Sequence, residues 1–497
     1  MREREAKFAP APGFRLPDLT GVVEGVSTAP ADTLDLQTTY FDTPDLRLTR
    51  SGASLRYRND EGWLVKLPES DGGYKAMLVR REHRFDGPPG APPADALDLV
   101  LGLVRTAAVE PVSRMRTHRR RLELRGPDDK PLAEVVDDEV SILDRGHVAA
   151  RFRELEVELR EESDPELAHV VVDRLREAGA GEPDPTPKVV RALGSRALDA
   201  PDVLPAPELG RAANAGDVVR VALTASVARL VGHDAAVRLG EDPEGVHQAR
   251  VATRRLRSDL RTFRALVDEE WCETLRDELK WLGTLLGSVR DADVLLARLR
   301  ARVEHLPEPD RDAAAALVTR LGAERDRARA DLLEGMGGRR YLELLDRLVD
   351  AARAPVLTPE AGQAAGDVLP GLVRKPLGRL DHAVDELDDD PPDEALHDVR
   401  KRAKQARYAA EAAASATGKP ARRLASALED VQDVLGEHQD AVVAEQWLRD
   451  ALAAASARQT FVIGQLAALE RLEAVASRAA WRDAWKKASR KRLRSWI

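Results

Sequence analysis

The spacing of apolar residues changes once along this chain, and that change constrains the fold more than any other feature. Up to about residue 197, apolar and polar residues mostly alternate, which is typical of β-strands. From about residue 217 onward, apolar residues recur every three to four positions, as in α-helices. A stretch rich in proline and alanine, 200–207, separates the two patterns. The sequence therefore predicts an α+β multidomain protein, with a β domain at 1–197, a linker at 198–212 and an all-α domain at 213–497.

The β domain is expected to form an antiparallel barrel. A first strand contains residues 3–7, and further alternating segments lie at 38–41, 53–58, 63–67, 74–85, 112–124, 132–143 and 151–159. Turn sequences such as Asn59-Asp60-Glu61-Gly62 lie between these segments, at the spacing of hairpins. Seven or eight strands arranged in this way predict an eight-stranded antiparallel tunnel or barrel with flanking helices, including one at 165–178.

One face of nearly every predicted strand is charged, and both signs occur. The clearest groups that share a strand face are Glu3 with Glu5 and Lys7, Arg56 with Arg58, Arg80 with Glu82 and Arg84, Arg114 with Arg116, Glu134 with Asp138, and Glu154 with Glu156 and Glu158. On a single strand such a face is ordinarily exposed to solvent. Their recurrence on nearly every strand instead favours an inverted barrel, with charges inside and apolar faces such as Leu155, Val157 and Leu159 covered by helices.

A charged interior costs free energy unless it holds ligands of opposite charge. Carboxylates are the ligands preferred by hard divalent cations such as Mg²⁺ and Mn²⁺, whereas arginine and lysine bind phosphate oxygens. Many residues of both kinds together indicate chemistry on a chain of phosphates, with metal ions neutralising its charge. No Ser-His-Asp or Cys-His arrangement occurs in order near these motifs, so water is the expected nucleophile.

The order of these motifs resembles the CYTH family of triphosphate tunnel metalloenzymes over about residues 1–197. The matching residues are Glu3-x-Glu5-x-Lys7, Thr39-Tyr40-Phe41-Asp42-Thr43, Leu48, Arg50, Gly52, Leu55-Arg56-x-Arg58, Lys66, Arg81-Glu82 and Glu154-x-Glu156. The resemblance implies an eight-stranded tunnel. Members of the family hydrolyse inorganic triphosphate or nucleoside or thiamine triphosphates, or cyclise ATP.

The resemblance also implies roles for single residues. The implied ligands of Mg²⁺ or Mn²⁺ are Glu3, Glu5, Asp138, Glu154 and Glu156, with Asp137 as an alternative to Asp138. The implied phosphate ligands are Lys7, Arg56, Arg58, Lys66, Arg81, Arg114, Arg116 and Lys188. Glu5 and Lys7 are the implied catalytic residues, which orient or activate the attacking water.

The all-α domain repeats internally. His247, Arg250, Arg254 and Arg257 recur with identical spacing as His397, Arg400, Lys404 and Arg407. A second pair of motifs follows, Leu286-Gly287 with Arg290-Asp291-Ala292 and Leu435-Gly436 with Gln439-Asp440-Ala441. The period is too long for a solenoid. We therefore expect two duplicated helical bundles, at about 213–350 and 365–497, that face one another.

Each repeat carries its histidine and basic residues on one helix face, opposite apolar residues such as Leu256 and Leu260. One such face alone is ordinarily solvated, but its duplication favours a groove for an extended anion. The spacing is poor for zinc, because a second histidine or an acidic ligand at helical spacing is missing.

These motifs resemble the CHAD family over about residues 210–497. The resemblance implies binding of inorganic polyphosphate and frequent fusion to a CYTH domain. The implied binding residues are His247, Arg250, Arg254, Arg257, Arg290, His397, Arg400, Lys401, Lys404, Arg407 and His438.

The predicted function is therefore metal-dependent hydrolysis of tripolyphosphate or another triphosphate, with polyphosphate as partner of the helical domain. The alternatives are a non-catalytic polyphosphate-binding scaffold, an adenylate cyclase or a thiamine triphosphatase. The single cysteine, Cys272, and the absence of an apolar run near the roughly 20 residues of a membrane span favour a cytoplasmic protein without a membrane partner, with polyphosphate granules as one location. The net charge of −9 argues against a general nucleic-acid binder.

Overall fold

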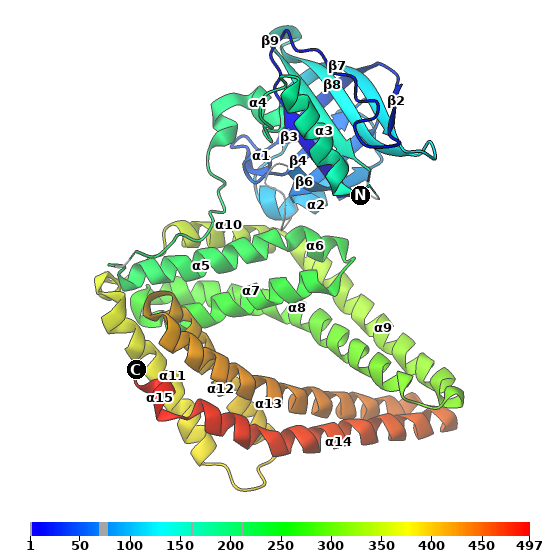
Figure 1. Cartoon of the computed structure of the whole chain (residues 1–497). Helices are drawn as coiled ribbons and strands as arrows, with labels where there is room; N and C mark the ends of the chain where they lie inside the picture. Colours follow the sequence, from blue (N-terminus) through cyan, green and yellow to red (C-terminus); the bar gives the residue numbers. More distant parts are fainter. Residues whose placement is uncertain (1, 69–77, 161–162, 211) are drawn as a thin grey trace. The chain divides into compact units, whose positions relative to one another are not determined.

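The computed structural model describes residues 2–68, 78–160, 163–210 and 212–497. The chain divides into two compact units, Met1–Asp202 and Val203–Ile497. The first is built mainly of strands and the second of helices, which confirms the predicted fold class (Figure 1). Within the described residues, no helix combines the length and the apolar character needed to cross a membrane.

The strands of the first unit close into an antiparallel barrel. They are β1 (Arg2–Phe8), β2 (Ser27–Pro30), β3 (Leu34–Asp42), β4 (Ser54–Arg58), β5 (Gly62–Pro68), β6 (Leu78–Phe85), β7 (Glu110–Arg125), β8 (Pro131–Asp144) and β9 (His147–Leu159). Their order is β2-β7-β3-β4-β5-β6-β1-β9-β8, and pairing of β7 with β8 closes the ring, with β2 added outside it. The eight strands of the ring confirm the predicted barrel.

The barrel is inverted, as the charge pattern predicts. Leu155 and Val157 of β9 are fully buried on its outer side, against Leu167, Val171 and Leu175 of α3 (Pro165–Glu177). Helix α3 begins at the N-cap Asp164, whose carboxylate accepts a hydrogen bond of 2.9 Å from the backbone N–H of Glu166. The apolar residues that would fill an ordinary barrel therefore lie outside it, which leaves the inward faces to polar residues.

The described residues of this unit also form the α-helices α1 (Arg47–Arg50), α2 (Ala94–Val104) and α4 (Lys188–Leu193). The predicted strands match the observed ones within a few residues, although β3 and β9 each begin four residues earlier than predicted. Strand β2 and helix α2 lack a prediction, and β2 is only four residues long and ends in a proline, so it carries little periodic signal. Residues 74–77 of the predicted strand 74–85 lie outside the described residues.

Asp42 is the acidic residue of the Thr39–Leu48 motif, and it lies at the end of β3, directly before a turn. Asp42, 1% exposed, accepts hydrogen bonds from the backbone N–H groups of Thr43, Leu48 and Thr49 at 2.7, 2.9 and 2.8 Å. Its carboxylate thereby satisfies the first N–H groups of α1, where Leu46 adopts a left-handed conformation. Asp42 therefore fixes the end of a barrel strand and does not line the interior.

The second unit contains two similar helical halves. Its helices are α5 (Ala215–Gly232), α6 (Asp234–Leu239), α7 (Pro243–Thr262), α8 (Glu269–Glu304), α9 (Glu308–Gly337), α10 (Arg339–Arg353), α11 (Ala365–Asp385), α12 (Asp393–Thr417), α13 (Lys419–Ala451), α14 (Ala457–Ala488) and α15 (Lys491–Arg494). Helices α5, α7, α8 and α9 pack in the same sequence as α11, α12, α13 and α14. Across the halves, α7 packs on α12, α5 on α11 and α9 on α14.

The two halves meet at equivalent points of their sequences. Ala-Gly-Asp-Val occurs at 215–218 and again at 365–368, at the start of α5 and α11. The backbone N–H of Ala215 donates to the carbonyl of Gln363 at 2.9 Å, and that of Ala365 donates to the carbonyl of Ala213 at 3.1 Å. This reciprocal pairing is what a local two-fold relation between duplicated segments requires, and it places α7 and α12, which carry the histidine motifs, side by side.

Candidate active site

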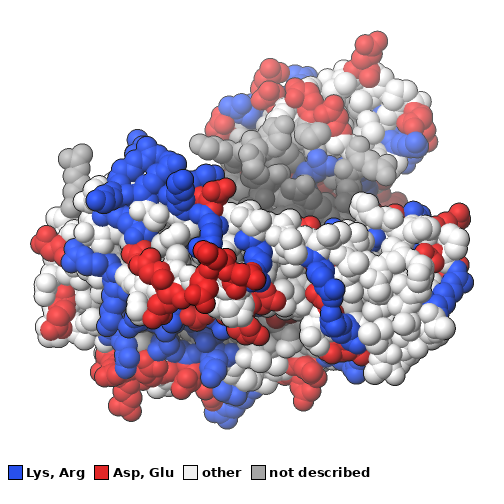
Figure 2. Space-filling view, turned by 90° about the horizontal axis from the view of Figure 1, so that it is seen from below, with Lys and Arg blue, Asp and Glu red and all other residues white. Residues whose placement is uncertain are grey.

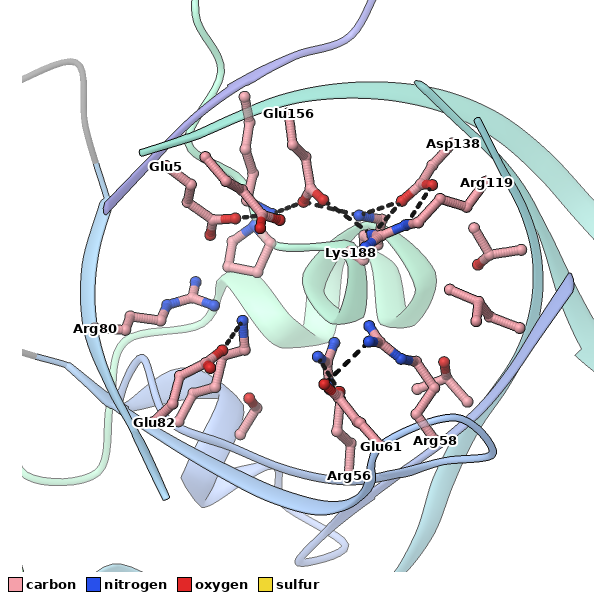
Figure 3. A pocket seen from close by; sticks show the side chains of 18 of the residues that line it. Glu5, Arg56, Arg58, Glu61, Arg80, Glu82, Arg119, Asp138, Glu156 and Lys188 are labelled. Carbon is pink, nitrogen blue, oxygen red and sulfur yellow. Dashed lines mark hydrogen bonds and ion pairs between the residues drawn. The ribbon is translucent and has the colours of Figure 1, made fainter. Parts of the chain in front are cut away.

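The barrel encloses a cavity of about 450 Å³ whose lining is dominated by charged side chains (Figure 3). Its charged residues are Arg4, Glu5, Lys7, Arg56, Arg58, Asp60, Glu61, Lys66, Arg80, Glu82, Arg84, Arg119, Arg121, Glu134, Asp138, Glu156, Glu158, Arg160 and Lys188. Most of them project from inward-facing positions of the strands, and others come from the turn at 59–61 or from the start of α4. Both signs of charge therefore surround one enclosed space.

Three carboxylates on one wall could hold a metal ion. Glu5 lies on β1, Glu156 and Glu158 lie on β9, and these two strands pair so that Glu5 is opposite Glu158. One oxygen from each of the three lies within 4.8 Å of the other two. The Oε1 atom of Glu5 is buried without a hydrogen-bond partner, which is costly for a carboxylate. An oxygen-only donor set with one unsatisfied atom fits Mg²⁺ or Mn²⁺.

Two lysines lie beside this wall. Lys7 Nζ is 3.1 Å from Glu5 Oε2 and also pairs with Glu156, whereas Lys188 Nζ is 2.8 Å from Glu156 Oε1 and 2.8 Å from Asp138 Oδ2. Burial by itself lowers the pKa of Lys7, but the neighbouring carboxylates outweigh burial and raise that pKa well above its ordinary value. Both lysines therefore stay cationic beside the carboxylates.

Arg119 of β7 completes the same network. It donates to both oxygens of Asp138, at 2.9 and 2.8 Å, and to Glu156 Oε2 at 3.2 Å. Burial raises the pKa of Glu156, but Lys188, Lys7 and Arg119 together pull it well below its ordinary value. Glu156 is therefore ionised, although it is only 2% exposed.

Helix α4 brings its own residues to the cavity. It begins directly after Pro187, its N-cap residue, which has an extended backbone conformation. Its first residue, Lys188, points at the carboxylates, and Arg191 one turn later donates to Glu154 Oε2 at 3.1 Å. Glu154 is fully buried, and it also contacts Lys7 and Lys188 at 3.4 and 3.1 Å.

The opposite wall carries the other cations. Arg56 and Arg58 project from β4, Lys66 from β5 and Arg80 from β6 (Figure 3). Lys66 Nζ lies 2.8 Å from Glu82 Oε1. The separation of these cations from the carboxylate wall leaves space between them, where a chain of phosphates could contact both.

The structure places most of the predicted tunnel residues in or against this cavity. These are Glu5, Lys7, Arg56, Arg58, Lys66, Asp138, Glu156 and Lys188 in the lining, and Glu154 directly behind it. Asp138 faces inward, whereas Asp137 pairs with Arg153 at 2.8 Å outside the lining, so the choice between the two falls on Asp138. The side chain of Glu3 lies outside the described residues.

The structure places three of the predicted phosphate ligands, Arg81, Arg114 and Arg116, outside the cavity. All three are exposed and absent from the lining. On β7 the inward residues are Met115, Thr117, Arg119 and Arg121, and on β6 they are Arg80, Glu82 and Arg84. Because side chains alternate between faces, an error of one residue moves a whole strand's set to the other side.

Several lining residues have no assigned role in the sequence-based prediction. Glu158 continues the alternation of Glu154 and Glu156, and Arg119 and Arg121 share a strand face, so period-two spacing was a usable signal for all three. Glu61 gave no such signal because it lies in a turn, outside the strand pattern.

The helical unit holds a second charged site, on α7 and α12. Arg254, Arg400 and Lys404 make no ion pair within the described part of the chain, and the Nε atoms of both arginines are buried without a hydrogen-bond partner. Burial, together with Arg254, Arg400, Arg250 and Arg407, lowers the pKa of Lys404 to about 7. A gathering of cations this costly is relieved by a bound anion.

The neighbours of this cation cluster are partly paired. Arg250 contacts Asp291 at 2.8 Å, and Arg407 contacts Glu429 at 2.9 Å. On the face of the molecule shown in Figure 2, many lysines and arginines likewise lie next to acidic residues. The unpaired state of the cluster is therefore distinct from the ordinary surface.

Other residues predicted to bind polyphosphate occupy varied positions. Burial, followed by Arg290, lowers the pKa of His247, and burial with Lys401 and Arg400 lowers that of His397. Both histidines therefore belong to the cationic surroundings of the cluster. His438 instead is 2% exposed and contacts Asp393 at 3.2 Å, at the start of α12. This contact joins α13 to the first turn of α12.

In both Leu-Gly motifs, the glycine lies next to an arginine of the preceding helix. A Cβ atom at Gly287 would lie 3.9 Å from Arg250 Nε, and one at Gly436 would lie 3.6 Å from Arg400 Nε. In each half, the arginine of the histidine motif thus lies across a glycine of the next helix. The duplicated motif encodes the packing of an arginine against a neighbouring backbone.

Each of the two units matches a known protein family. The CYTH domain family matches residues 1–190, and the CHAD domain family matches residues 221–449. The Mycobacterium tuberculosis protein Rv2226 is 33% identical over 493 residues, which cover 93% of this chain and 92% of that protein. The chain belongs to the proteins in which a CYTH domain, the triphosphate-tunnel fold, is joined to a CHAD domain.

Two further similarities concern one unit each. Human thiamine-triphosphatase is 40% identical over 72 residues, 14% of this chain and 28% of that enzyme. The solved CHAD domain of the plant Ricinus communis is 27% identical, covers 56% of this chain and 94% of its own, and has a TM-score of 0.46.

We predict that Glu158→Gln weakens binding of Mn²⁺ to the full chain by at least about tenfold, because one of three hard oxygen donors loses its charge. Titration calorimetry with Mn²⁺ measures this affinity. Glu139→Gln is the matched control, since Glu139 is 54% exposed and pairs with Arg120 outside the cavity. Equal affinities of the two variants would exclude Glu158 from the metal site.

Proposed function

We propose that the barrel is a metal-dependent triphosphatase acting first on inorganic tripolyphosphate, and that the helical unit binds inorganic polyphosphate. The enzymatic part of this proposal rests on the cavity of the barrel. One wall carries a cluster of carboxylates with their paired lysines, and the opposite wall carries further cations. Such an arrangement matches a substrate that is itself a chain of anions and that requires a divalent cation.

In this proposal Glu5, Glu156 and Glu158 hold Mg²⁺ or Mn²⁺. The bound cation supplies charge neutralisation and polarises the phosphoryl group toward attack. Lys7, Lys188 and Arg119 then exchange part of their carboxylate contacts for phosphate oxygens. Because these cations are anchored by at least two carboxylates each, they are held in place before the substrate arrives.

The rest of the substrate would lie along the opposite wall. Arg56 and Arg58 offer forked guanidinium groups, which suit phosphate oxygens better than single donors do. Lys66 and Arg80 extend the same cationic surface. Water is the nucleophile, and Glu5, next to Lys7, is the group that would orient it.

The lining favours an inorganic substrate over a nucleotide. Tyr40 is the one aromatic residue among the described residues that line the cavity, and it is 5% exposed. A base would therefore find little surface to stack on. The local similarity to human thiamine-triphosphatase makes thiamine triphosphate the second candidate substrate.

Binding of polyphosphate by the helical unit rests on the cation cluster of α7 and α12. The chain has a net charge of −9, so carboxylates are abundant, yet none pairs with Arg254, Arg400 or Lys404 among the described residues. An extended polyanion supplies many negative groups at short intervals, which is what a row of cations along two adjacent helices would bind.

The direct test is phosphate release from tripolyphosphate, ATP and thiamine triphosphate with Mg²⁺ or Mn²⁺. We expect release that requires the metal, is fastest with tripolyphosphate, and falls by more than about 100-fold in Glu156→Gln, because the loss of a group on which the site depends costs several kcal/mol. If no substrate is hydrolysed while polyphosphate still binds, the protein is a non-catalytic polyphosphate-binding scaffold.

A pH dependence follows from Lys404. With a pKa of about 7 it is largely neutral above that pH, and a bound anion favours its protonated form, so binding takes up a proton. The affinity for long-chain polyphosphate should therefore fall as the pH rises from 7 to 8.5. Calorimetry in buffers of different ionisation enthalpy detects the proton uptake.

Lys404→Arg is the matched variant for this prediction, because arginine keeps its charge at every pH in the range. It should bind with an affinity that changes little above pH 7. If the affinity of Lys404→Arg falls with pH as steeply as that of the wild type, another group takes up the proton. The pKa values of His247 and His397 are also lowered, so these histidines would contribute only at lower pH.

A further inference from the structure

The turn between β4 and β5 places a carboxylate against the cationic wall. Strand β4 ends at Arg58 and β5 begins at Gly62, so residues 59–61 form the turn. Asn59 ties the turn to β3, since its side chain accepts a hydrogen bond of 2.7 Å from the backbone N–H of Gln37. Glu61 points inward, and its side chain is 11% exposed.

The contacts of Glu61 resemble those of a phosphate group. Arg56 Nη2 donates to Oε1 of Glu61 at 2.7 Å, and Arg58 Nη2 lies 3.0 Å from Oε2 (Figure 3). One oxygen thus contacts each guanidinium. Arg58 also contacts Asp60 of the same turn, with 2.6 Å between its Nε and Asp60 Oδ1.

Glu61 differs from the other buried carboxylates in how it is held. Glu156 and Asp138 are fixed by strand pairing on both sides, in β9 and β8. Glu61 lies outside the paired residues, next to Gly62, whose φ of +78° is accessible to glycine at little cost. The backbone of the turn can therefore shift, and carry the Glu61 carboxylate away from the two arginines, without breaking a strand pair.

We propose that Glu61 is an internal competitor that occupies Arg56 and Arg58 while no phosphate is bound there. This inference rests on the proposed function, because it concerns the same phosphate-binding wall. A triphosphate, with several negative charges and an accompanying cation, displaces the single carboxylate. Orthophosphate carries fewer charges and binds more weakly, so Glu61 displaces it more readily and promotes its release.

The consequence is weaker binding of every phosphate that occupies this wall. A ligand must displace one carboxylate from two guanidinium groups, which lowers the affinity of all such ligands by the same factor. A triphosphate has further phosphate groups to contact the rest of the cavity and still binds, whereas orthophosphate is released. Removing the charge of Glu61 should therefore tighten binding of product and substrate alike, and slow product release.

The test is Glu61→Gln in the full chain, which keeps the size of the side chain. We expect the inhibition constant of orthophosphate and the KM for tripolyphosphate each to fall by about tenfold, because the variant no longer presents a competing charge to Arg56 and Arg58. The kcat should stay unchanged or decrease. Glu134→Gln is the matched control, since Glu134 lines the same cavity but pairs with Arg121, and it should change both constants less.

An inhibition constant for orthophosphate that is unchanged or higher in Glu61→Gln would overturn the proposal. A higher metal requirement in the variant would instead identify Glu61 as a metal ligand. If neither protein hydrolyses tripolyphosphate, the proposed function fails separately. Calorimetry with pyrophosphate then decides the inference, which requires tighter binding by Glu61→Gln than by the wild type and by Glu134→Gln.

Discussion

Charge buried inside the barrel is the constraint on which the first unit depends. Transfer of one ion out of water costs several kcal/mol even after relaxation, so an interior of this kind persists only with close pairing. Glu156 shows how the cost is offset, since it contacts Lys7, Lys188 and Arg119 at once. The same constraint moves the apolar faces outward, where α3 covers them, and leaves in the cavity a set of groups that a metal ion and a phosphate chain can take over.

The helical unit uses the opposite arrangement. Where the barrel pairs its buried carboxylates with cations, α7 and α12 bring together Arg254, Arg400 and Lys404, which make no ion pair among the described residues. Burial, together with repulsion from the neighbouring arginines, lowers the pKa of Lys404 to about 7. The barrel is thus suited to a short anion with its metal, and the helical unit to an anion that brings many charges of its own.

The sequence predicted most of this through periodicity. Alternation identified the barrel, its inversion and residues such as Glu5 and Glu156, and the repeated spacing of His247 and His397 identified the duplication. It failed for Arg114 and Arg116 because two adjacent phases of one basic strand look equally charged, and only the pairing register separates them. It also failed for Glu61, since a turn residue has no strand face, and its contact with the arginines depends on where the turn folds.

The most direct test of this account is a crystal structure of the full chain with Mn²⁺ and a slowly hydrolysed imido analogue of tripolyphosphate. The account predicts an anomalous manganese peak among Glu5, Glu156 and Glu158, with the analogue inside the barrel between Lys7 and Arg56. An analogue bound to the helical unit alone, with neither metal nor phosphate in the barrel, would contradict it.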